Sequence, residues 1–129
     1  MAAIAPEPTG PEETVAVPEA DGDARPVEQG IVSRRALLNV LAAARSAIAR
    51  HDPDAVVTLG GDCLVNLAPT AHLSERYGDD LAVLWVDAHP DIMGAQQFRH
   101  AHAHVLAMLM GMGDPDFVAP HAQEDRETV

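Results

Sequence analysis

Residues 81–91, LAVLWVDAHPD, place an unbroken apolar run directly before a cluster of acidic and imidazole side chains. A continuous apolar run of this length is typical of a strand buried on both faces of a parallel sheet. A second short run, AVVTL at residues 55–59, ends at Gly60 and Gly61 and predicts another such strand. Because a helix can connect the two runs, the pattern favours a βαβ unit and therefore an α/β fold.

Three helices are expected around these strands. Residues 33–51 should form the first, with Ser33 as its N-cap, because apolar side chains recur at three- and four-residue spacing (Leu37, Val40, Leu41, Ala44 and Ile48). Residues 63–77 should form the second, which ends at Gly78. AHVLAMLMGMG at residues 103–113 predicts a third, of roughly ten residues.

The remaining parts of the chain look different. Residues 1–30 hold five of the ten prolines and seven acidic residues, which predicts an irregular lead-in. Residues 31–113 should form the α/β domain, and residues 114–129 an acidic, polar tail. Two strands are too few for a stable parallel sheet, so we expect part of a larger domain. An unpaired sheet edge and uncovered apolar faces also predict self-association into a homo-oligomer.

Composition excludes several classes of function. The 129 residues carry 8 basic and 20 acidic side chains, a net charge of -12, which disfavours a nucleic-acid partner. A single cysteine excludes an intramolecular disulfide. We find neither an uncharged apolar run of about 18 residues nor a basic and then apolar N-terminal segment. We therefore expect a cytoplasmic protein with no membrane partner.

The polar residues that follow the two predicted strands indicate a metal site. In α/β sheets ligands bind beyond the carboxyl ends of the strands, where Cys63 follows the first run and Asp87, His89 and Asp91 follow the second. In an extended chain, residues spaced two apart point to the same side. Two neighbouring carboxylates repel each other unless a dication or a shared proton neutralises them. The alternative is a solvated turn after a strand.

The types of donor atom do not decide which metal ion would bind. Oxygen ligands suit manganese or magnesium, and an imidazole also admits iron, nickel or zinc. A thiolate at Cys63 would favour zinc, iron or nickel over manganese. Cys63 could also be a small, partly apolar residue at a helix start.

Three motifs together resemble a known family. GGDC at residues 60–63, VLWVDAHPDI at 83–92 and HAHVLAMLMG at 102–111 are similar, in this order, to the first half of the metal-binding core of the arginase, agmatinase and formiminoglutamase superfamily. The resemblance covers roughly residues 33–113. It implies a three-layer α/β/α domain with a parallel sheet and two manganese ions at the strand ends. It also implies hydrolysis of a linear carbon–nitrogen bond in a guanidino or amidino compound.

The resemblance assigns roles to individual residues. Asp87 matches a carboxylate that bridges the two metals, His89 an imidazole ligand of one metal, and Asp91 a carboxylate ligand of the other. His102 matches an acid/base histidine, so catalysis would depend on Asp91 and His102. Cys63 stands where the family usually has a metal-binding histidine. Because of this difference, zinc remains an alternative to manganese.

Histidines 100 and 104 flank the predicted acid/base residue in the run HAHAH. They could bring two more imidazoles near the site. They could also be solvated residues at the entry to the third helix.

The family completes its site with an Asp-x-Asp pair after a later strand. The only such pair after His102 is Asp114 and Asp116, which we expect to form a polar turn. The chain therefore looks incomplete, and we expect negligible hydrolysis from it alone. One alternative is a non-catalytic metal-binding or interaction module that retains half of the site. Another is a cysteine hydrolase built on Cys63 and His102.

Overall fold

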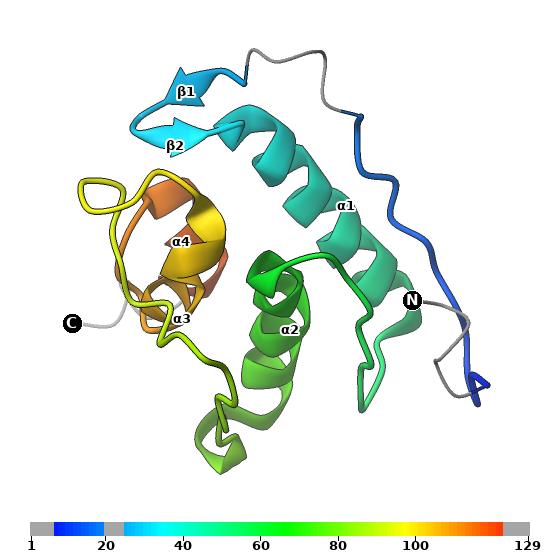
Figure 1. Cartoon of the computed structure of the whole chain (residues 1–129). Helices are drawn as coiled ribbons and strands as arrows, with labels where there is room; N and C mark the ends of the chain where they lie inside the picture. The colour runs from blue at the N-terminus through cyan, green and yellow to red at the C-terminus, as the bar shows by residue number, and fades with distance from the viewer. Residues whose placement is uncertain (1–6, 20–24, 123–129) are drawn as a thin grey trace.

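The computed structural model describes residues 7–19 and 25–122, and within them helices predominate (Figure 1). The predicted lead-in and tail therefore lie partly outside the described residues. In chain order the elements are β1 (Val27–Glu28), β2 (Ile31–Val32), α1 (Arg34–His51), η2 (Cys63–Asn66), α2 (Leu67–Tyr77), η3 (Gly78–Asp80), η4 (Ala101–His104), α3 (Val105–Leu109) and α4 (Pro115–Ala122), where η marks a 3₁₀ helix.

Helix α1 confirms the prediction for residues 33–51, except at its cap. Ser33 lies at the N-cap in a left-handed conformation, and its side chain makes no capping hydrogen bond. Instead, the backbone N–H of Arg35 donates to a carboxylate oxygen of Glu28 at 3.1 Å. The carboxylate that serves the helix start therefore comes from the preceding hairpin, which sequence spacing alone does not reveal.

The second predicted helix is also confirmed, as η2 followed by α2. Pro69 lies in the first turn of α2, where helices tolerate proline. The other end of α2 holds the chain that follows α1: the imidazole of His72 contacts the carbonyl of Pro53 at 2.8 Å, and the hydroxyl of Tyr77 donates to the carbonyl of Asp54 at 2.7 Å. Helices α1 and α2 also pack directly against each other.

A β-hairpin occupies the end of the predicted lead-in. β1 and β2 pair antiparallel across Gln29 and Gly30, which both have positive φ, as a two-residue turn of this type requires. The N–H of Val32 donates to the carbonyl of Arg99 at 3.0 Å, so the hairpin is tied to the loop before η4. The predicted boundary at residue 30 therefore falls inside a structured element.

The two predicted strands do not form in the described residues. Residues 55–59 and 81–86 have no regular secondary structure, and the only sheet there is the β1–β2 pair. Most of their side chains are open to solvent, with exposures of 87% for Val57, 89% for Leu84 and 86% for Val86, although Trp85 packs partly against the core. A strand in a parallel sheet needs hydrogen-bonding neighbours, and among the described residues neither segment pairs with another strand.

The third predicted helix is shorter than expected, because its first turn is the 3₁₀ helix η4 and α3 ends at Leu109. Helix α4 occupies the first part of the predicted tail. Phe117 and Val118 are 1% and 8% exposed and join the core, so these two residues of the predicted polar tail are not solvated. Apolar side chains from the hairpin, from η4 and from helices α1 to α4 form this core (Ile31, Leu41, Leu67, Ala68, Ala101, Val105, Met108, Phe117 and Val118).

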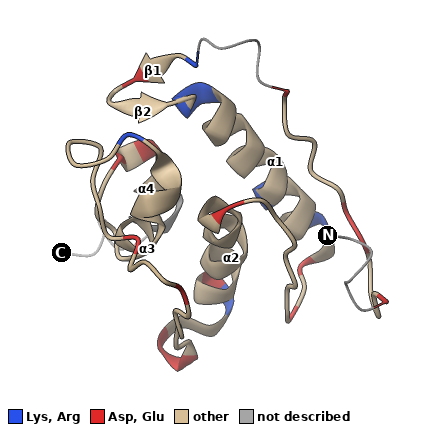
Figure 2. Ribbon diagram, viewed as in Figure 1, with Lys and Arg blue, Asp and Glu red and all other residues tan. Residues whose placement is uncertain are grey.

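Basic side chains concentrate on α1, whereas acidic ones are spread along the chain (Figure 2). Helix α1 carries four of the eight basic residues (Arg34, Arg35, Arg45 and Arg50). Glu13 pairs with Arg50 and His51 at the carboxyl end of this helix, which fixes an irregular segment of the lead-in there. Within the described residues, none of the helices has the length and apolar character needed to cross a bilayer.

Candidate metal centre

Two loops bring the predicted donors together although no sheet lies between them. Asp62 caps η2, accepting a hydrogen bond from the N–H of Leu64 at 2.9 Å, and so fixes Cys63 at the helix start. On the other side, the N–H of Met93 donates to the carbonyl of Ala103 at 3.0 Å, which holds the segment after Asp91 against η4. Because η2 and η4 contact each other, the two loops meet.

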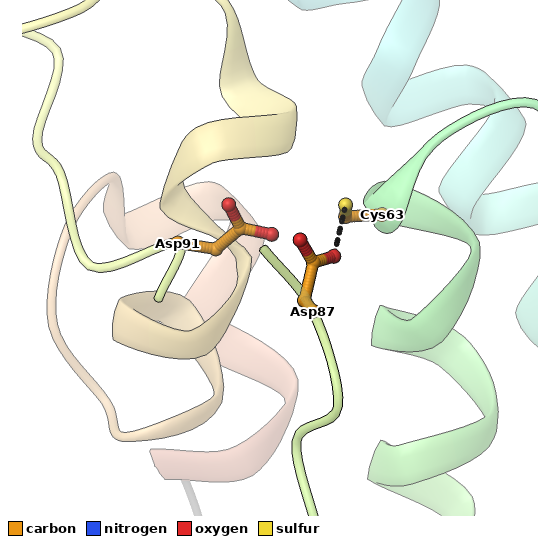
Figure 3. A group of neighbouring side chains, drawn as sticks. All are labelled: Cys63, Asp87 and Asp91. Atoms are coloured by element: carbon orange, nitrogen blue, oxygen red, sulfur yellow. Dashed lines mark hydrogen bonds between the residues drawn. The ribbon is translucent and has the colours of Figure 1, made fainter. Parts of the chain in front are cut away.

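Cys63, Asp87 and Asp91 form a compact group of donors (Figure 3). One donor atom from each lies within 4.8 Å of the others. The thiol of Cys63 donates to Oδ2 of Asp87 at 3.5 Å, and the carboxylate of Asp91 points toward that of Asp87 from the opposite side. Two carboxylates and one thiol therefore face a common point.

Asp91 gives the clearest sign that the group can hold a cation. The residue is 4% exposed, and its Oδ2 is buried with no hydrogen-bond partner. A buried carboxylate oxygen without a partner is costly, and a bound cation would remove that cost. Its backbone has φ of 50°, and its carbonyl accepts hydrogen bonds from the N–H groups of Leu106 and Ala107. The first turn of α3 thus holds this residue in place.

The three donors shift one another's pKa values. Interaction with Asp91, burial and interaction with Asp87 raise the pKa of the Cys63 thiol to about 12. Hydrogen bonds from the backbone N–H of His89 and from Cys63 lower the pKa of Asp87. At neutral pH the thiol therefore keeps its proton, and a metal ion would have to displace it. A neutral thiol beside two carboxylates also argues against a cysteine nucleophile, which needs an electropositive setting.

The other predicted site residues lie outside this group. The side chain of His89 is 81% exposed, and its Nδ1 lies 3.8 Å from Oδ1 of Asp87. His102 is half-buried, with its ring edge-on to Phe98 at 5.8 Å between centroids. His100 is exposed and also contacts Phe98. His104 is buried and contacts the carbonyl of Phe98 through Nε2 at 2.6 Å, so it is not a solvated residue at the helix entry.

The Asp114 and Asp116 pair has a structural role. The guanidinium of Arg34 forms two hydrogen bonds to Asp114, at 2.8 and 2.9 Å, and a third to Asp116. Oδ1 of Asp114 also accepts from the N–H of Asp116 at the start of α4. We expected these two residues to form a polar turn. They instead form ion pairs with Arg34, which join the start of α4 to α1.

Sequence reasoning overlooked the parts that position Cys63. Asp62 serves as the cap of η2, and Gly60 leaves room for Val65. The signal was present in the GGD run that precedes Cys63, since an acidic residue directly before a helix start is a common N-cap.

Adding a methyl group at Gly60 is expected to destabilise the chain. A Cβ there would lie 2.1 Å from Cγ1 and 2.9 Å from Cβ of Val65, and a β-branched side chain has few other rotamers. We expect Gly60→Ala to lower the free energy of unfolding by about 1–3 kcal/mol, as overpacking does. Urea unfolding followed by circular dichroism measures this.

Gly61→Ala is the matched control, because nothing lies within 4 Å of a Cβ at that position. It should leave the stability nearly unchanged. Equal effects of the two substitutions would show that the loop does not pack as described.

Comparisons with known proteins agree on one family. The sequence model of the Arginase family matches residues 12–121. The chain belongs to the arginase family. The resemblance of the three motifs is therefore confirmed at the level of the family.

Curated relatives and a solved structure support this assignment. Arginase of Neurospora crassa is 29% identical over 108 residues, which cover 79% of this chain and 28% of the relative. Arginase 1, mitochondrial, of rice (subspecies indica) is 32% identical over 78 residues, covering 60% and 23%. The arginase of Coccidioides posadasii is 39% identical over 67 residues, covering 47% and 21%. The chain thus spans less than a third of each of these relatives.

The structure of Entamoeba histolytica arginase in complex with L-ornithine superimposes with a TM-score of 0.66 at 22% identity. The match covers 85% of this chain and 38% of the other. The fold is therefore part of the three-layer α/β/α arginase fold. Its parallel sheet stays a prediction, as does a cytoplasmic location.

Proposed function

We propose that this chain carries part of the metal centre of a hydrolase that cleaves a linear carbon–nitrogen bond in a small guanidino or amidino compound. The observation that carries the proposal is the convergence of Cys63, Asp87 and Asp91, with a buried oxygen of Asp91 that has no partner. Anionic donors around such an oxygen fit a divalent cation. Membership of the arginase family supports the class of reaction.

Each residue has a proposed part in this chemistry. A divalent ion, when bound, supplies Lewis-acid activation of water for attack on the guanidinium carbon. Asp87 and Asp91 provide negative charge to hold the ion, and the backbone N–H of His89 orients Asp87 through a 2.9 Å hydrogen bond. We propose that His102, on η4 beside η2, passes a proton to the leaving amine. The family pattern makes a pair of manganese ions the starting assumption.

We propose that the chain as given turns over slowly or not at all. Asp114 and Asp116 are held by Arg34, so they are not free to serve as further ligands. Two hollows among the described residues have none of the three donors in their lining. One, of about 320 Å³, is lined by residues 95–100, and the other, of about 140 Å³, lies between α1 and α2. Neither provides a substrate pocket beside the donors.

A urea-release assay tests the proposal. The chain is stripped of metal, loaded with Mn²⁺, Co²⁺ or Zn²⁺, and incubated with L-arginine or agmatine. We expect bound metal by elemental analysis, with urea release no higher than that of the Asp91→Asn variant. Steady-state release that Asp91→Asn abolishes would establish a hydrolase and overturn the proposed inactivity. A chain that binds no divalent ion would overturn the metal centre itself.

A non-catalytic metal-binding or interaction module is the second candidate. The engagement of Asp114 and Asp116 with Arg34 favours it, because a second ion would lack these carboxylates. The number of ions bound separates the two candidates. A catalytic centre of the family type should bind two ions per chain or per assembly, whereas a structural half-site should bind one or none.

We also propose that the chain associates with further copies of itself. Residues 55–59 and 81–86 leave large apolar side chains open to solvent (Val57, Leu59, Val83, Leu84 and Val86). Apolar surface of this kind typically marks an interface. Edge-to-edge pairing of these extended segments would bury it.

A further inference from the structure

We propose that Cys63 makes this centre selective for a borderline divalent ion of the zinc type over manganese, in a site with three protein donors and an open position. The inference rests on the proposed metal centre and specifies which ion it takes. It depends on the donor atoms that the described residues bring together, one sulfur and two carboxylate groups.

The first step of the argument is the chemistry of the donors. Thiolates favour zinc and the other borderline ions of the first transition row, whereas manganese favours an all-oxygen or oxygen and imidazole set. Because one of the three donors is a sulfur, the set departs from what a hard ion prefers. The ordinary order of affinities already places zinc above manganese, and a thiolate should widen that gap.

The second step is the distance between the donors. In a tetrahedral zinc site the metal–sulfur distance is about 2.3 Å and the metal–oxygen distance about 2.1 Å, so a sulfur and an oxygen ligand lie roughly 3.6 Å apart. Sγ of Cys63 and Oδ2 of Asp87 are 3.5 Å apart. This hydrogen-bonded pair therefore lies at a spacing that a single tetrahedral ion can span.

The third step is an independent sign that a ligand belongs there. Oδ2 of Asp91 has no hydrogen-bond partner, the residue is 4% exposed, and its carboxylate faces Asp87 and Cys63 (Figure 3). With Asp91 as the third ligand, a tetrahedral ion keeps one position for water. Three protein ligands and one open position are the arrangement of hydrolytic zinc sites.

Cobalt spectroscopy and a zinc–manganese competition test the inference on the whole chain. Bound Co²⁺ should give a thiolate-to-cobalt charge-transfer band and the intense visible bands of a tetrahedral ion. Cys63→Ser should abolish the charge-transfer band. It should also reduce the ratio of zinc to manganese affinity, measured by calorimetry, at least about 10-fold, with most of the change in zinc binding.

Two controls separate this inference from the proposed function. Asp79→Asn, which removes an exposed acidic side chain on η3, should leave both the spectrum and the affinity ratio unchanged. If no ion binds, or if Asp91→Asn binds ions as well as the wild type, the metal centre fails. If ions bind but Cys63→Ser leaves the affinity ratio unchanged, only the selectivity fails.

A third result would overturn the inference without relying on a variant. Wild-type chain that binds Co²⁺ with no charge-transfer band would show that sulfur is not a ligand. This keeps the test decisive should Cys63→Ser fold poorly.

Discussion

Asp91→Asn is expected to weaken the binding of divalent ions by at least about 100-fold, because the loss of a direct ligand should exceed the 10–100-fold cost of losing an outer partner. Asparagine keeps the size of the side chain and tolerates the positive φ at this position. The hydrogen bonds that the Asp91 carbonyl accepts from Leu106 and Ala107 should therefore remain. The change removes one negative charge and little else.

The same substitution should leave the metal-free chain as stable as the wild type or more stable. The buried carboxylate of Asp91 faces that of Asp87, and its Oδ2 has no partner, so the substitution removes a repulsion between two carboxylates. Weaker metal binding together with an unchanged or raised melting temperature is the signature of a ligand kept for function. Isothermal calorimetry and thermal melts in a chelator measure the two effects.

Asp79→Asn is again the matched control, since it removes the same charge from an exposed position. It should leave both the affinity for divalent ions and the melting temperature of the metal-free chain nearly unchanged. A metal-free Asp91→Asn chain that melts well below the wild type would show instead that the Asp91 carboxylate supports the fold.

The helices could be predicted from the sequence because their signals are local. Apolar spacing and terminating residues set α1 and α2, and Gly78 ends α2 as expected. Whether the two apolar runs form strands could not be predicted from local signals in the same way. Residues 81–86 have the composition of a buried strand, but a strand also needs hydrogen-bonding neighbours, which the segment itself does not encode.

The sequence predicted that Asp87 and Asp91 lie close together with Cys63. This prediction assumed an extended chain, and the backbone at these residues is not extended throughout. Spacing of two residues suggested that Asp87, His89 and Asp91 point to one side of an extended chain. The positive φ of Asp91 breaks that alternation, and His89 turns to solvent. Cys63 joins the two carboxylates because η2 and η4 pack together, which the strand argument did not require.

Helix α4 could not be predicted from the composition of its segment. An acidic segment with two large apolar residues reads as a solvated tail. Phe117 and Val118 nevertheless reach the core, because Asp114 caps the helix and also binds Arg34 of α1. A contact across eighty residues of sequence cannot be read from local pattern.

Arg34→Ala is expected to lower the free energy of unfolding by about 2–4 kcal/mol. This value lies between the cost of losing an exposed ion pair and the cost of breaking a fully buried one. The side chains of Arg34 and Asp114 are 9% and 7% exposed. Without the guanidinium, Asp114 would remain as a buried and unpaired charge. Urea unfolding should therefore also show α4 released from α1 at low denaturant.

Asp116→Ala provides the matched control, because this partner of Arg34 is 58% exposed. It should cost less than about 1 kcal/mol, as exposed pairs do. Similar effects of Arg34→Ala and Asp116→Ala would contradict the assignment of the stability to the Asp114 contact.

The pH dependence of the same pair follows from the sign of its pKa shift. Burial alone would raise the pKa of Asp114, but hydrogen bonds from Arg34 and from the N–H of Asp116 outweigh it, so the pKa lies below its usual value. The stabilisation is then complete above the unfolded-state pKa of about 3.9 and is lost as the pH falls through the folded value. Wild type and Arg34→Ala should accordingly differ in stability at neutral pH and converge in acid. A difference that persisted unchanged below the folded pKa would show that Arg34 acts through packing of its side chain rather than through its charge.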